Sequence, residues 1–302
     1  MPKSKKTKYK LDQSPFYYLQ TKKKLANLLN LKLTNLKQLT LSKDLYTEKE
    51  FFDPQRNKPR LVEKPKPELK QVQKCIEELL KRIEIPNYIH GPAKGCSYVS
   101  NAKAHINSLE VRSLDIKKYF PSTASKRIYW FFHKRMKCSS DVAGILTKLS
   151  SYKEHLPTGS PLSPLLSYFA HIDMWEEINE IVELAGCTLT VYVDDVTISG
   201  THVSDKLIWQ IKKKFHGYGL LSNDTKEKDY RGKKSSEVTG VIIKKGILKL
   251  PNRQHKKMYE IRKEICAEPD IHKRNKLQEQ LKGLRSNERQ IKNANDIQAD
   301  KT

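Results

Sequence analysis

In Thr190-Val191-Tyr192-Val193-Asp194-Asp195-Val196-Thr197-Ile198, two adjacent carboxylates lie between two apolar runs that are rich in β-branched residues. Such runs favour strands, and a tight turn between them predicts an antiparallel hairpin with both acids at its tip. Side chains alternate along a strand, so a turn is needed to bring Asp194 and Asp195 to one metal site. Burying the pair unpaired costs several kcal/mol, which divalent cations remove. The alternative is a solvated turn, because Asp is a common turn residue.

The charge of the chain is strongly positive, since 58 Lys and Arg against 34 Asp and Glu give a formal net charge of +24. Each phosphate contact by Lys or Arg releases counterions, so an excess of this size indicates a polyanionic partner such as nucleic acid. A basic tail alone would give the same charge, but 14 Tyr, 3 Trp and 37% hydrophobic residues indicate a folded body. With 302 residues, the chain can form one large domain or two or three subdomains.

The cysteines are scattered and show neither a C-x-x-C pair nor a zinc-type spacing with His. They are Cys75, Cys96, Cys138, Cys187 and Cys266. We therefore expect no disulfide framework and a reducing, cytoplasmic location. No apolar stretch approaches the ~20 residues of a membrane span, and the basic start, residues 2–8, lacks the apolar core of a signal peptide. The expectation is a protein without a membrane partner and with a solvated basic arm.

Hydrophobic periodicity and turn residues predict an α+β order of elements along the chain. The predicted elements are helices within 11–45, an extended hairpin within 53–67, a helix from Pro67 or Glu68 to about Ile83, a helix opening at 101–105, a strand over 109–116, a helix through 129–132, a helix over 163–184 with Ser163 as N-cap, the acid hairpin, a helix over 204–218, a β-rich stretch over 237–250 and a basic helical tail. No internal repeat is visible.

A third acid, Asp115, stands at the end of the predicted strand over 109–116. An isolated Asp at a strand end is commonly a helix cap, and this remains the alternative. Two strands of one sheet that each end in acids can instead converge on a pair of Mg²⁺ ions. Two metals ~4 Å apart activate an attacking hydroxyl and stabilise the leaving oxygens in phosphoryl transfer. Hard cations of this kind take oxygen ligands, which carboxylates supply.

The loop Leu156–Pro164 lies between the acids and contains Gly159. Glycine permits a close backbone approach, and the positive N-terminus of the following helix points at this loop. These features suit a nucleotide or a template strand at the loop. An ordinary Pro-rich start of a helix is the alternative.

Together these segments resemble a known family. The elements that carry the resemblance are, in order, Asp115 followed by Tyr119-Phe120-Pro121-Ser122, then Gly159-Ser160-Pro161-Leu162-Ser163-Pro164, then Tyr192-Val193-Asp194-Asp195. Their order and spacing resemble the palm of a reverse transcriptase. Two further signatures, Asn101-Ala102-Lys103-Ala104-His105 and Val238-Thr239-Gly240, resemble the N-A-x-x-H and V-T-G elements of bacterial retron reverse transcriptases. The segment Arg60–Pro65 resembles the retron fingers, and the likeness covers roughly residues 55 to 250.

The resemblance implies a right-hand polymerase fold of α+β class, with an antiparallel palm sheet packed on helices and a short helical thumb. It implies these parts: a basic arm and helices over 1–50, fingers over 51–108, a palm over 109–243 with fingers helices interleaved, and a thumb with a basic tail over 244–302. It also implies that Asp115, Asp194 and Asp195 are catalytic ligands of two Mg²⁺ ions, assisted by the backbone carbonyl of Ile116.

Further site residues follow from the resemblance. The implied nucleotide-binding residues are Arg60, Lys64, Phe120, Gly159, Ser160 and Lys226. Phe120 occupies the steric-gate position, where a bulky ring excludes a ribose 2′-hydroxyl; a core Phe is the alternative. Lys226 matches the proposed acid that protonates pyrophosphate, and a surface lysine is the alternative. His105, like the rest of the signature residues Asn101, Ala102, Val238, Thr239 and Gly240, is expected to be structural.

The thumb is expected to grip the nucleic acid. The implied RNA-binding residues are Arg253, Lys256, Lys257, Arg262, Lys263 and Arg285. RNA stems are read mostly through shape, phosphates and 2′-hydroxyls, which suits such a basic surface. The alternative is a solvated charged helix. The implied partners are dNTPs, a cognate structured non-coding RNA with its DNA product, a separate effector protein in antiphage defence, and a host RNase H that removes the template.

The leading hypothesis is therefore an RNA-directed DNA polymerase of a retron. The alternatives are a group-II-intron-like or other defence-associated reverse transcriptase, and an RNA-binding scaffold without catalysis. Two residues depart from the family pattern. Thr158 stands where many relatives carry Gln, which weakens an expected nucleotide contact. Val193 stands where Ala is most frequent in retron enzymes, beside the primer end.

Overall fold

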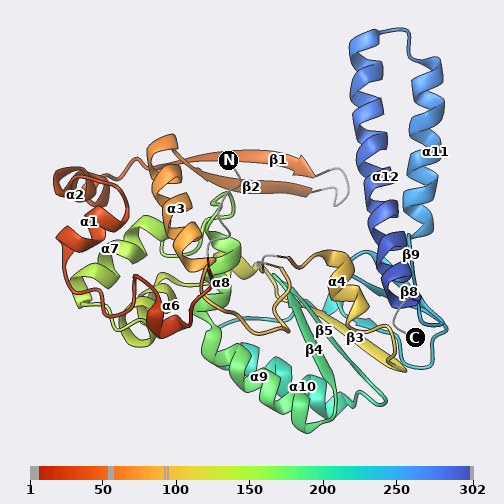
Figure 1. The fold of residues 1–302 in the computed structure, drawn as a ribbon, viewed down its shortest axis with the longest axis horizontal. Coiled ribbons are helices and arrows are strands. Elements are labelled where there is room, and N and C mark those ends of the chain that lie inside the picture. Colours follow the sequence, from red (N-terminus) through yellow and green to blue (C-terminus); the bar gives the residue numbers. More distant parts are fainter. Residues whose placement is uncertain (1–6, 54–57, 92, 94, 300–302) are drawn as a thin grey trace.

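The computed structural model describes residues 7–53, 58–91, 93 and 95–299, so the first part of the basic arm lies outside the described residues. The fold is α+β with antiparallel sheets, as the sequence predicts (Figure 1). The strands are β1 Tyr46–Asp53, β2 Lys58–Pro65, β3 Glu110–Asp115, β4 Thr188–Tyr192, β5 Asp195–Gly200, β6 Lys228–Asp229, β7 Ser236–Val238, β8 Val241–Lys244 and β9 Ile247–Lys249. None of the described helices is long and apolar enough to cross a membrane.

The helices follow in chain order. They are the 3₁₀-helix η1 Leu11–Gln13, α1 Lys22–Leu28, α2 Leu33–Leu41, α3 Pro67–Leu80, α4 Tyr98–Lys103, α5 Tyr119–Ser122, α6 Ser125–Trp130, the π-helix η2 Phe131–Arg135, α7 Ser140–Ser150, α8 Ser163–Ala170, α9 Ile172–Leu184, α10 Asp205–Gly217, the 3₁₀-helix η3 Asp224–Lys226, α11 Asn252–Ala267 and α12 Ile271–Ala299.

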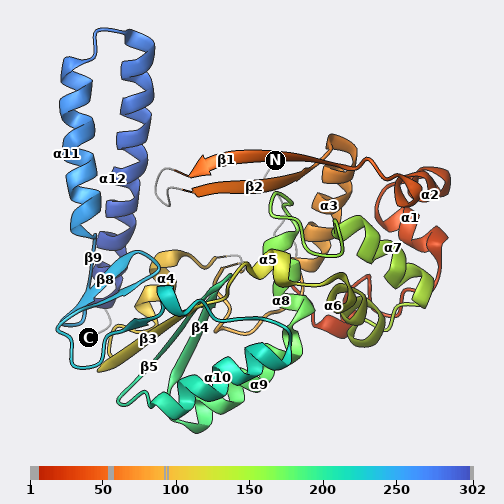
Figure 2. The same cartoon turned by 180° about the vertical axis from the view of Figure 1, so that it is seen from behind.

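A four-stranded sheet with strand order β4-β5-β3-β6 forms the middle of the molecule. Helices α9 and α10 cover one face, and Trp175 of α9 meets Phe215 of α10 edge to face at a centroid distance of 6.0 Å (Figure 2). Helix α4 and the small sheet β7-β8-β9 lie on the other side. The apolar residues Val196 and Ile198 of β5 are fully buried, which anchors the central strand. One face of the sheet is thus packed on helices while the other remains partly open.

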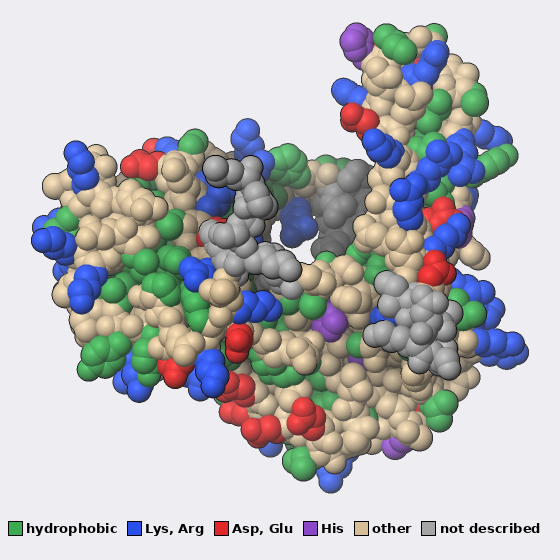
Figure 3. Space-filling view, viewed as in Figure 1, with side chains coloured by type: hydrophobic (Ala, Val, Ile, Leu, Met, Phe, Trp, Pro, Cys, Tyr) green, Lys and Arg blue, Asp and Glu red, His purple; other side chains and the backbone are tan. Residues whose placement is uncertain are grey.

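Two further parts extend from this sheet. On one side, α1–α3 and α6–α8 share a continuous apolar core with it, and the two-stranded ribbon β1–β2 projects from them (Figure 1). On the other side, β7–β9, α4, α11 and α12 enclose a second core around Val241, Met258 and Leu281. The hairpin of α11 and α12 rises opposite the ribbon, and the surface is hollowed between them (Figure 3).

Several predicted elements are confirmed. Helix α3 begins at Pro67, which suits the first helical turn because proline lacks the backbone N–H. Helix α10 is capped by Ser204, whose Oγ accepts a hydrogen bond from the backbone N of Leu207 at 3.2 Å. The predicted extended hairpin exists as β1–β2, but it begins earlier, at Tyr46, and its turn lies outside the described residues.

Two helix predictions are wrong. The predicted single helix over 163–184 divides at His171, whose backbone N bonds the carbonyl of Tyr168 and closes a tighter turn. Ser163 is not the N-cap, because Leu162 holds that position and the Ser163 hydroxyl donates to the carbonyl of Pro157 at 2.7 Å. The helix expected to open at residues 101–105 begins earlier, at Tyr98, and ends in this stretch.

The loop before α8 is fastened to the ribbon. Gly159 donates its backbone N–H to the carbonyl of Glu63 in β2 at 3.0 Å. The hydroxyl of Thr158 donates to the carbonyl of Leu61 at 3.1 Å and accepts from the backbone N of Glu63 at 3.2 Å. The carboxylate of Glu63, only 4% exposed, accepts from the backbone N of Thr158 and contacts His155 Nε2 at 3.0 Å. These contacts fix the base of the ribbon.

Gly159→Ala is expected to destabilise this junction. A Cβ at Gly159 would lie 2.5 Å from the carbonyl oxygen of Glu63, so the backbone must shift, at a cost of about 1–3 kcal/mol. Gly144→Ala in α7 is the control, because a Cβ there meets nothing within 4 Å and alanine favours a helix by up to ~1 kcal/mol. Urea denaturation measures both, and equal stability of the two variants would contradict the close-packing argument.

Candidate active site

The strand register places Asp115 and Asp195 side by side. Asp115, the last residue of β3, is the direct partner of Asp195, the first residue of β5. Directly opposed residues of antiparallel strands point to the same face, so both carboxylates face the open side of the sheet. The backbone N of Ile116 donates to the carbonyl of Asp194 at 2.9 Å, which fixes the hairpin end against β3.

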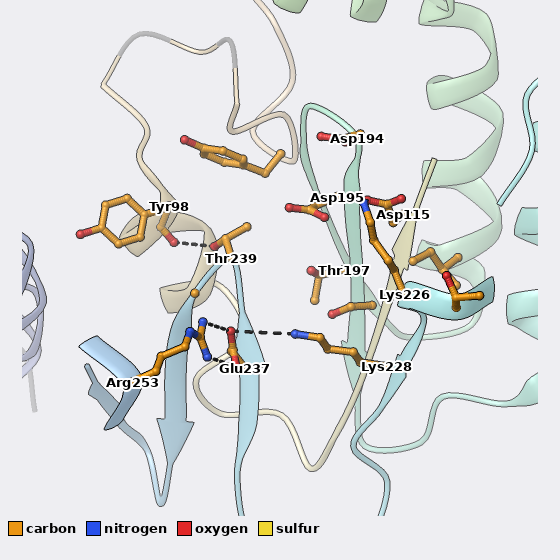
Figure 4. Close-up of a pocket in the computed structure, with 15 residues that line it drawn as sticks. Tyr98, Asp115, Asp194, Asp195, Thr197, Lys226, Lys228, Glu237, Thr239 and Arg253 are labelled. Carbon is orange, nitrogen blue, oxygen red and sulfur yellow. Dashed lines mark hydrogen bonds and ion pairs between the residues drawn. The ribbon is translucent and has the colours of Figure 1, made fainter. Parts of the chain in front are cut away.

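The predicted acid hairpin is present, with one correction. Tyr192 pairs with Asp195, so the turn consists of Val193 and Asp194 alone. Asp194 therefore lies at the tip, whereas Asp195 belongs to the strand (Figure 4). Val193 has a backbone φ of 60°, in the left-handed region that β-branched residues avoid. The surroundings must hold this turn against its strain.

Asp115 is tightly held. Its carboxylate is buried and accepts a bond from Lys226 Nζ at 2.5 Å on Oδ2 and one from Asn223 Nδ2 at 3.1 Å on Oδ1. The backbone N of Asn223 also donates to the carbonyl of Asp115 at 2.7 Å. The segment that follows α10 therefore supplies a counter-charge and two hydrogen bonds to one acid.

The environment of Asp195 differs from that of Asp115, because it disfavours the charged form of the carboxylate. Its pKa is raised to about 6, first because burial disfavours the charged form and then because Asp194 and Asp115 repel it, while Lys226 and Lys228 act in the opposite sense. The side chain is exposed to the space above the sheet. That space is a cavity walled by protein, so the carboxylate is partly desolvated although its surface is exposed. The acids thus form a centre of excess negative charge.

The acids border a cavity of about 540 Å³. Asp115, Asp194 and Asp195 lie at one end of this space, and Thr197 continues its floor along β5 (Figure 4). The opposite wall comes from β7, the turn after it and the start of α11, where Glu237 binds Arg253 at 2.9 and 2.5 Å and lies 3.9 Å from Lys228 Nζ. The size of the cavity suits a nucleotide-sized ligand.

The two signature elements meet beside this cavity. Asn101 Nδ2 donates to the hydroxyl of Thr239 at 3.3 Å, and this hydroxyl donates to the carbonyl of Tyr98 at 2.9 Å. Ala102 and Val238 are fully buried next to them, and Gly240 turns the chain with a φ of 80°. His105 is fully buried as well. The residues of both signatures therefore pack together, although 138 residues separate Asn101 from Thr239.

The expected nucleotide-binding residues lie in different places. Lys226 alone among the six lines the cavity. Arg60 pairs with Phe51 across the ribbon, and Lys64 Nζ lies 4.8 Å from the centroid of the same ring, so both cations share one face of β1–β2. Phe120 is half-buried on α5 beside Tyr119, with the ring centroids 6.2 Å apart.

Two residues of the loop make contacts within the protein. The close backbone approach at Gly159 is made to Glu63 of β2. The hydroxyl of Ser160 is buried and donates to Gln73 Oε1 at 2.7 Å, so it serves the fold. Thr158, the departure from the family pattern, uses its hydroxyl for the ribbon. Sequence reasoning missed this because the partners are far away in the chain.

The expected RNA-binding residues all have exposed side chains. They are Arg253, Lys256, Lys257, Arg262 and Lys263 on α11 and Arg285 on α12. Lys263 Nζ lies 4.9 Å from the ring centroid of Tyr259, whose side chain is itself exposed. Lys and Arg side chains gather along this helical hairpin on the face shown in Figure 3. Arg253 differs from the others because it also lines the cavity.

Sequence reasoning missed several residues that line the cavity. They are Tyr98, Ser113, Thr197, Lys228 and Glu237. A signal for some of them was present in the period of two along a strand. Ser113 precedes Asp115 by two residues, and Thr197 follows Asp195 by two. Tyr98 and Glu237 carried no such signal, because tertiary packing brings them to the site.

The carboxylate oxygens of Asp115, Asp194 and Asp195 are chemically suited to bind a hard cation. Carboxylate oxygens are the ligands that Mg²⁺, Mn²⁺ and Ca²⁺ prefer, and repulsion from Asp194 and Asp115 adds to burial in raising the pKa of Asp195. The side chains as they lie do not converge fully: among the described residues no three His, Cys, Asp or Glu side chains gather closely enough to hold a metal ion. Asp115 instead pairs with Lys226.

An antiparallel sheet with acids at the adjoining ends of two central strands, beside a cavity lined by both acids and bases, is the architecture of a nucleic-acid polymerase. The sequence model of the family "Reverse transcriptase (RNA-dependent DNA polymerase)" matches residues 48–243, so the match includes all three acids. The chain belongs to this family.

Curated relatives are retron reverse transcriptases. The chain is 31% identical over 202 residues to the Retron Se72 reverse transcriptase of Salmonella heidelberg (strain 579083-10), which covers 64% of this chain and 53% of the relative. It is 27% identical over 191 residues to the Retron Ec86 reverse transcriptase of Escherichia coli, and this match covers 61% of this chain and 58% of the relative. It is 23% identical over 259 residues to the Retron Mx162 reverse transcriptase of Myxococcus xanthus, and this match covers 74% of this chain and 53% of the relative. The matches thus span little more than half of these relatives.

The raised pKa of Asp195 predicts a pH dependence of stability. In a chelating buffer between pH 3.8, the ordinary pKa of an Asp, and about pH 6, Asp195 keeps a proton in the folded protein. The unfolded chain releases this proton in the same pH range. The free energy of unfolding therefore falls as the pH rises through this window. Asp195→Asn is expected to remove this part of the fall, as measured by urea denaturation at several pH values.

Asp141→Asn is the matched control for that experiment. Asp141 lies in the first turn of α7, pairs with Lys22 at 2.9 Å and has a 67% exposed side chain, so the same charge change occurs far from the site. The free energy of unfolding of Asp141→Asn should change with pH in the same way as that of the wild type. Identical profiles for Asp195→Asn and the wild type would contradict the electrostatic description of the site.

Proposed function

We propose that this chain is the RNA-directed DNA polymerase of a retron. In this role it copies part of a structured non-coding RNA into single-stranded DNA that stays linked to that RNA. The observation that carries the proposal is the direct pairing of Asp115 with Asp195, next to Asp194, within the family-matched segment. The similarity to three retron reverse transcriptases and the two signature elements support the retron assignment.

The proposed division follows the expected boundaries. The fingers are residues 51–108, the palm is residues 109–243 and the thumb is residues 244–302, preceded by an N-terminal part over 1–50. The separate apolar core around β7–β9, α11 and α12 supports a distinct thumb. The projecting ribbon β1–β2 opposite the thumb supports the fingers (Figure 1).

The proposed cofactor is Mg²⁺, as two ions. Asp115, Asp194 and Asp195, with the backbone carbonyl of Ile116, would hold them. Bound there, the ions activate the primer hydroxyl and neutralise charge on the triphosphate. Lys226 supports this proposal indirectly, because its ammonium group now balances the charge of Asp115. If Asp115 held an ion in place of Lys226, the ammonium group of Lys226 would be available to the leaving pyrophosphate.

The chain's own residues would bind and orient the substrates. Arg60 and Lys64, on one face of the ribbon, would hold the triphosphate of the incoming dNTP. Arginine offers a planar fork that binds two phosphate oxygens at once. Phe120 would exclude ribonucleotides through contact at the 2′ position. The exposed cations of α11 and α12 would bind the backbone of the cognate RNA, so this binding should weaken as salt rises.

The proposal extends to the partners named by the resemblance. A separate effector protein would use the RNA–DNA product in antiphage defence, and a host RNase H would remove the copied RNA. Both proteins would act in the bacterial cytoplasm.

Primer extension tests the polymerase assignment. The double variant Asp194→Asn/Asp195→Asn is expected to lose at least about 100-fold in DNA synthesis from its co-expressed RNA, because loss of a metal ligand costs more than loss of its outer partners. Asp141→Asn, on the exposed surface of α7, should retain full synthesis. Absence of synthesis by the wild type would overturn the function, and synthesis by the double variant would overturn the site.

Phe120→Ala tests the proposed gate. Removing the ring opens space at the sugar, so the preference for dNTPs over rNTPs should fall by about 10-fold or more, while dNTP incorporation continues. Single-nucleotide incorporation with each substrate measures the ratio. Phe52→Ala is the control, because this ring is 63% exposed on the ribbon and should leave the ratio unchanged. An unchanged ratio in Phe120→Ala would assign this ring to the core.

A further inference from the structure

One segment encloses the outer side of the acid hairpin. We call residues 88–91 together with 97–108 the flanking segment. Its first part adds to the free edge of β4: the backbone N of Val191 donates to the carbonyl of Tyr88, and the backbone N of His90 donates to the carbonyl of Val191, both at 2.8 Å. These bonds end two residues before the strained turn at Val193.

The contact at the tip is very close. A Cβ at Gly91 would lie 2.6 Å from the backbone N of Val193 and 2.7 Å from its Cγ2. Only glycine allows this approach without movement of the turn. The backbone of Gly91 thus supports the residue that immediately precedes Asp194.

The second part of the flanking segment places His105 under the hairpin. The ring is fully buried, with Nδ1 2.6 Å from the hydroxyl of Ser199 in β5 and Nε2 2.7 Å from the hydroxyl of Thr190 in β4. Ser108 donates its hydroxyl to Ser199 at 2.8 Å. One imidazole therefore joins both strands of the hairpin, through side chains on the same face as Asp195.

The ring acts as a neutral group. Burial, with a smaller effect of His90, lowers the pKa of His105 to about 3, so it carries no charge at working pH. A neutral imidazole donates through one nitrogen and accepts through the other. Because the Ser108 hydroxyl donates to the Ser199 hydroxyl, the hydrogen bonds are consistent when the Ser199 hydroxyl donates to Nδ1 of His105. The Nε2–H group of His105 then donates to the Thr190 hydroxyl. Each polar atom of this hydrogen-bonded chain has a partner, which fixes the ring and the two strands.

We propose that His105 and Gly91 are positioning residues for the catalytic hairpin. His105 fixes β4 relative to β5, and Gly91 fixes the turn, so that together they hold Asp194 and Asp195 in place beside Asp115. Neither residue lines the cavity. The inference rests on the proposed polymerase function, because it concerns the acids of that site. Misplacement of a reacting group by about 1 Å can cost ~100-fold in rate, so such support matters to catalysis.

The test compares His105→Phe with a matched buried histidine. His171 is also fully buried and has a lowered pKa, but it lies between α8 and α9, where Nδ1 donates to the carbonyl of Ser167 at 3.1 Å. His105→Phe should lower kcat for dNTP incorporation by at least ~10-fold with KM for dNTP within about twofold. His171→Phe should lower the melting temperature without this change in kcat.

Hydrogen exchange gives a readout independent of activity. In His105→Phe, amides of the peptide 188–200 should exchange at least ~10-fold faster than in the wild type, whereas His171→Phe should leave this peptide unchanged. Thr190→Val removes one hydroxyl at constant volume and should give an intermediate effect on both readouts. His105→Gln, whose amide can donate and accept, should restore part of kcat.

The outcomes separate this inference from the proposed function. The inference is wrong if the wild type synthesises DNA while His105→Phe has the wild-type kcat and the wild-type rate of amide hydrogen exchange in the peptide 188–200. Equal losses of kcat in His105→Phe and His171→Phe would reduce His105 to a general stabilising residue. Should His105→Phe fail to fold, Thr190→Val decides by the same criteria. A wild type without synthesis would overturn the function, while exchange in 188–200 would still decide whether His105 holds the hairpin.

Discussion

Repulsion between carboxylates on adjacent strands is the constraint on which the site depends. The β3–β5 register sets Asp115 directly opposite Asp195, with Asp194 next in the chain. Lys226 and Asn223 stabilise one member, whereas burial, and after it repulsion from Asp194 and Asp115, raises the pKa of Asp195. A like-charged set of this kind destabilises the fold until a cation joins it. The sheet therefore tolerates a local loss of stability at the point where chemistry is proposed.

Apart from Lys226, Lys228 and Arg253, which line the cavity, cations gather on surfaces around this acidic centre. Cations occupy one face of the ribbon β1–β2 and the exposed sides of α11 and α12, which stand on the two sides of the hollow in Figure 3. An acidic site by itself repels nucleic acid. Surrounding it with basic surfaces reverses the net field for an approaching polyanion. The large net charge and the acid cluster are thus parts of one arrangement.

The sequence predicted local elements better than their contacts. The acid hairpin, the strand that ends at Asp115 and the helix that begins at Pro67 follow from short patterns of apolar, turn and proline residues. The facing of Asp115 and Asp195 could not be derived this way, because strand register depends on residues far apart in the chain. The same holds for Ser160, whose hydroxyl binds Gln73, 87 residues away, and for the division of the helix at His171, which no proline or glycine marks.

The two signature elements acquire a physical meaning from their contacts. Asn101 holds Thr239 at one wall of the cavity, and His105, four residues later, holds Thr190 and Ser199 under the acid hairpin at the other. A buried hydrogen-bonding group left without its partner costs about 1–3 kcal/mol, so a single exchange at one of these residues lowers the stability of the contact. Because α4 and the turn after it carry both contacts, this short segment sets the separation between the acids and the Thr239 turn. A substrate in the cavity must fit that separation.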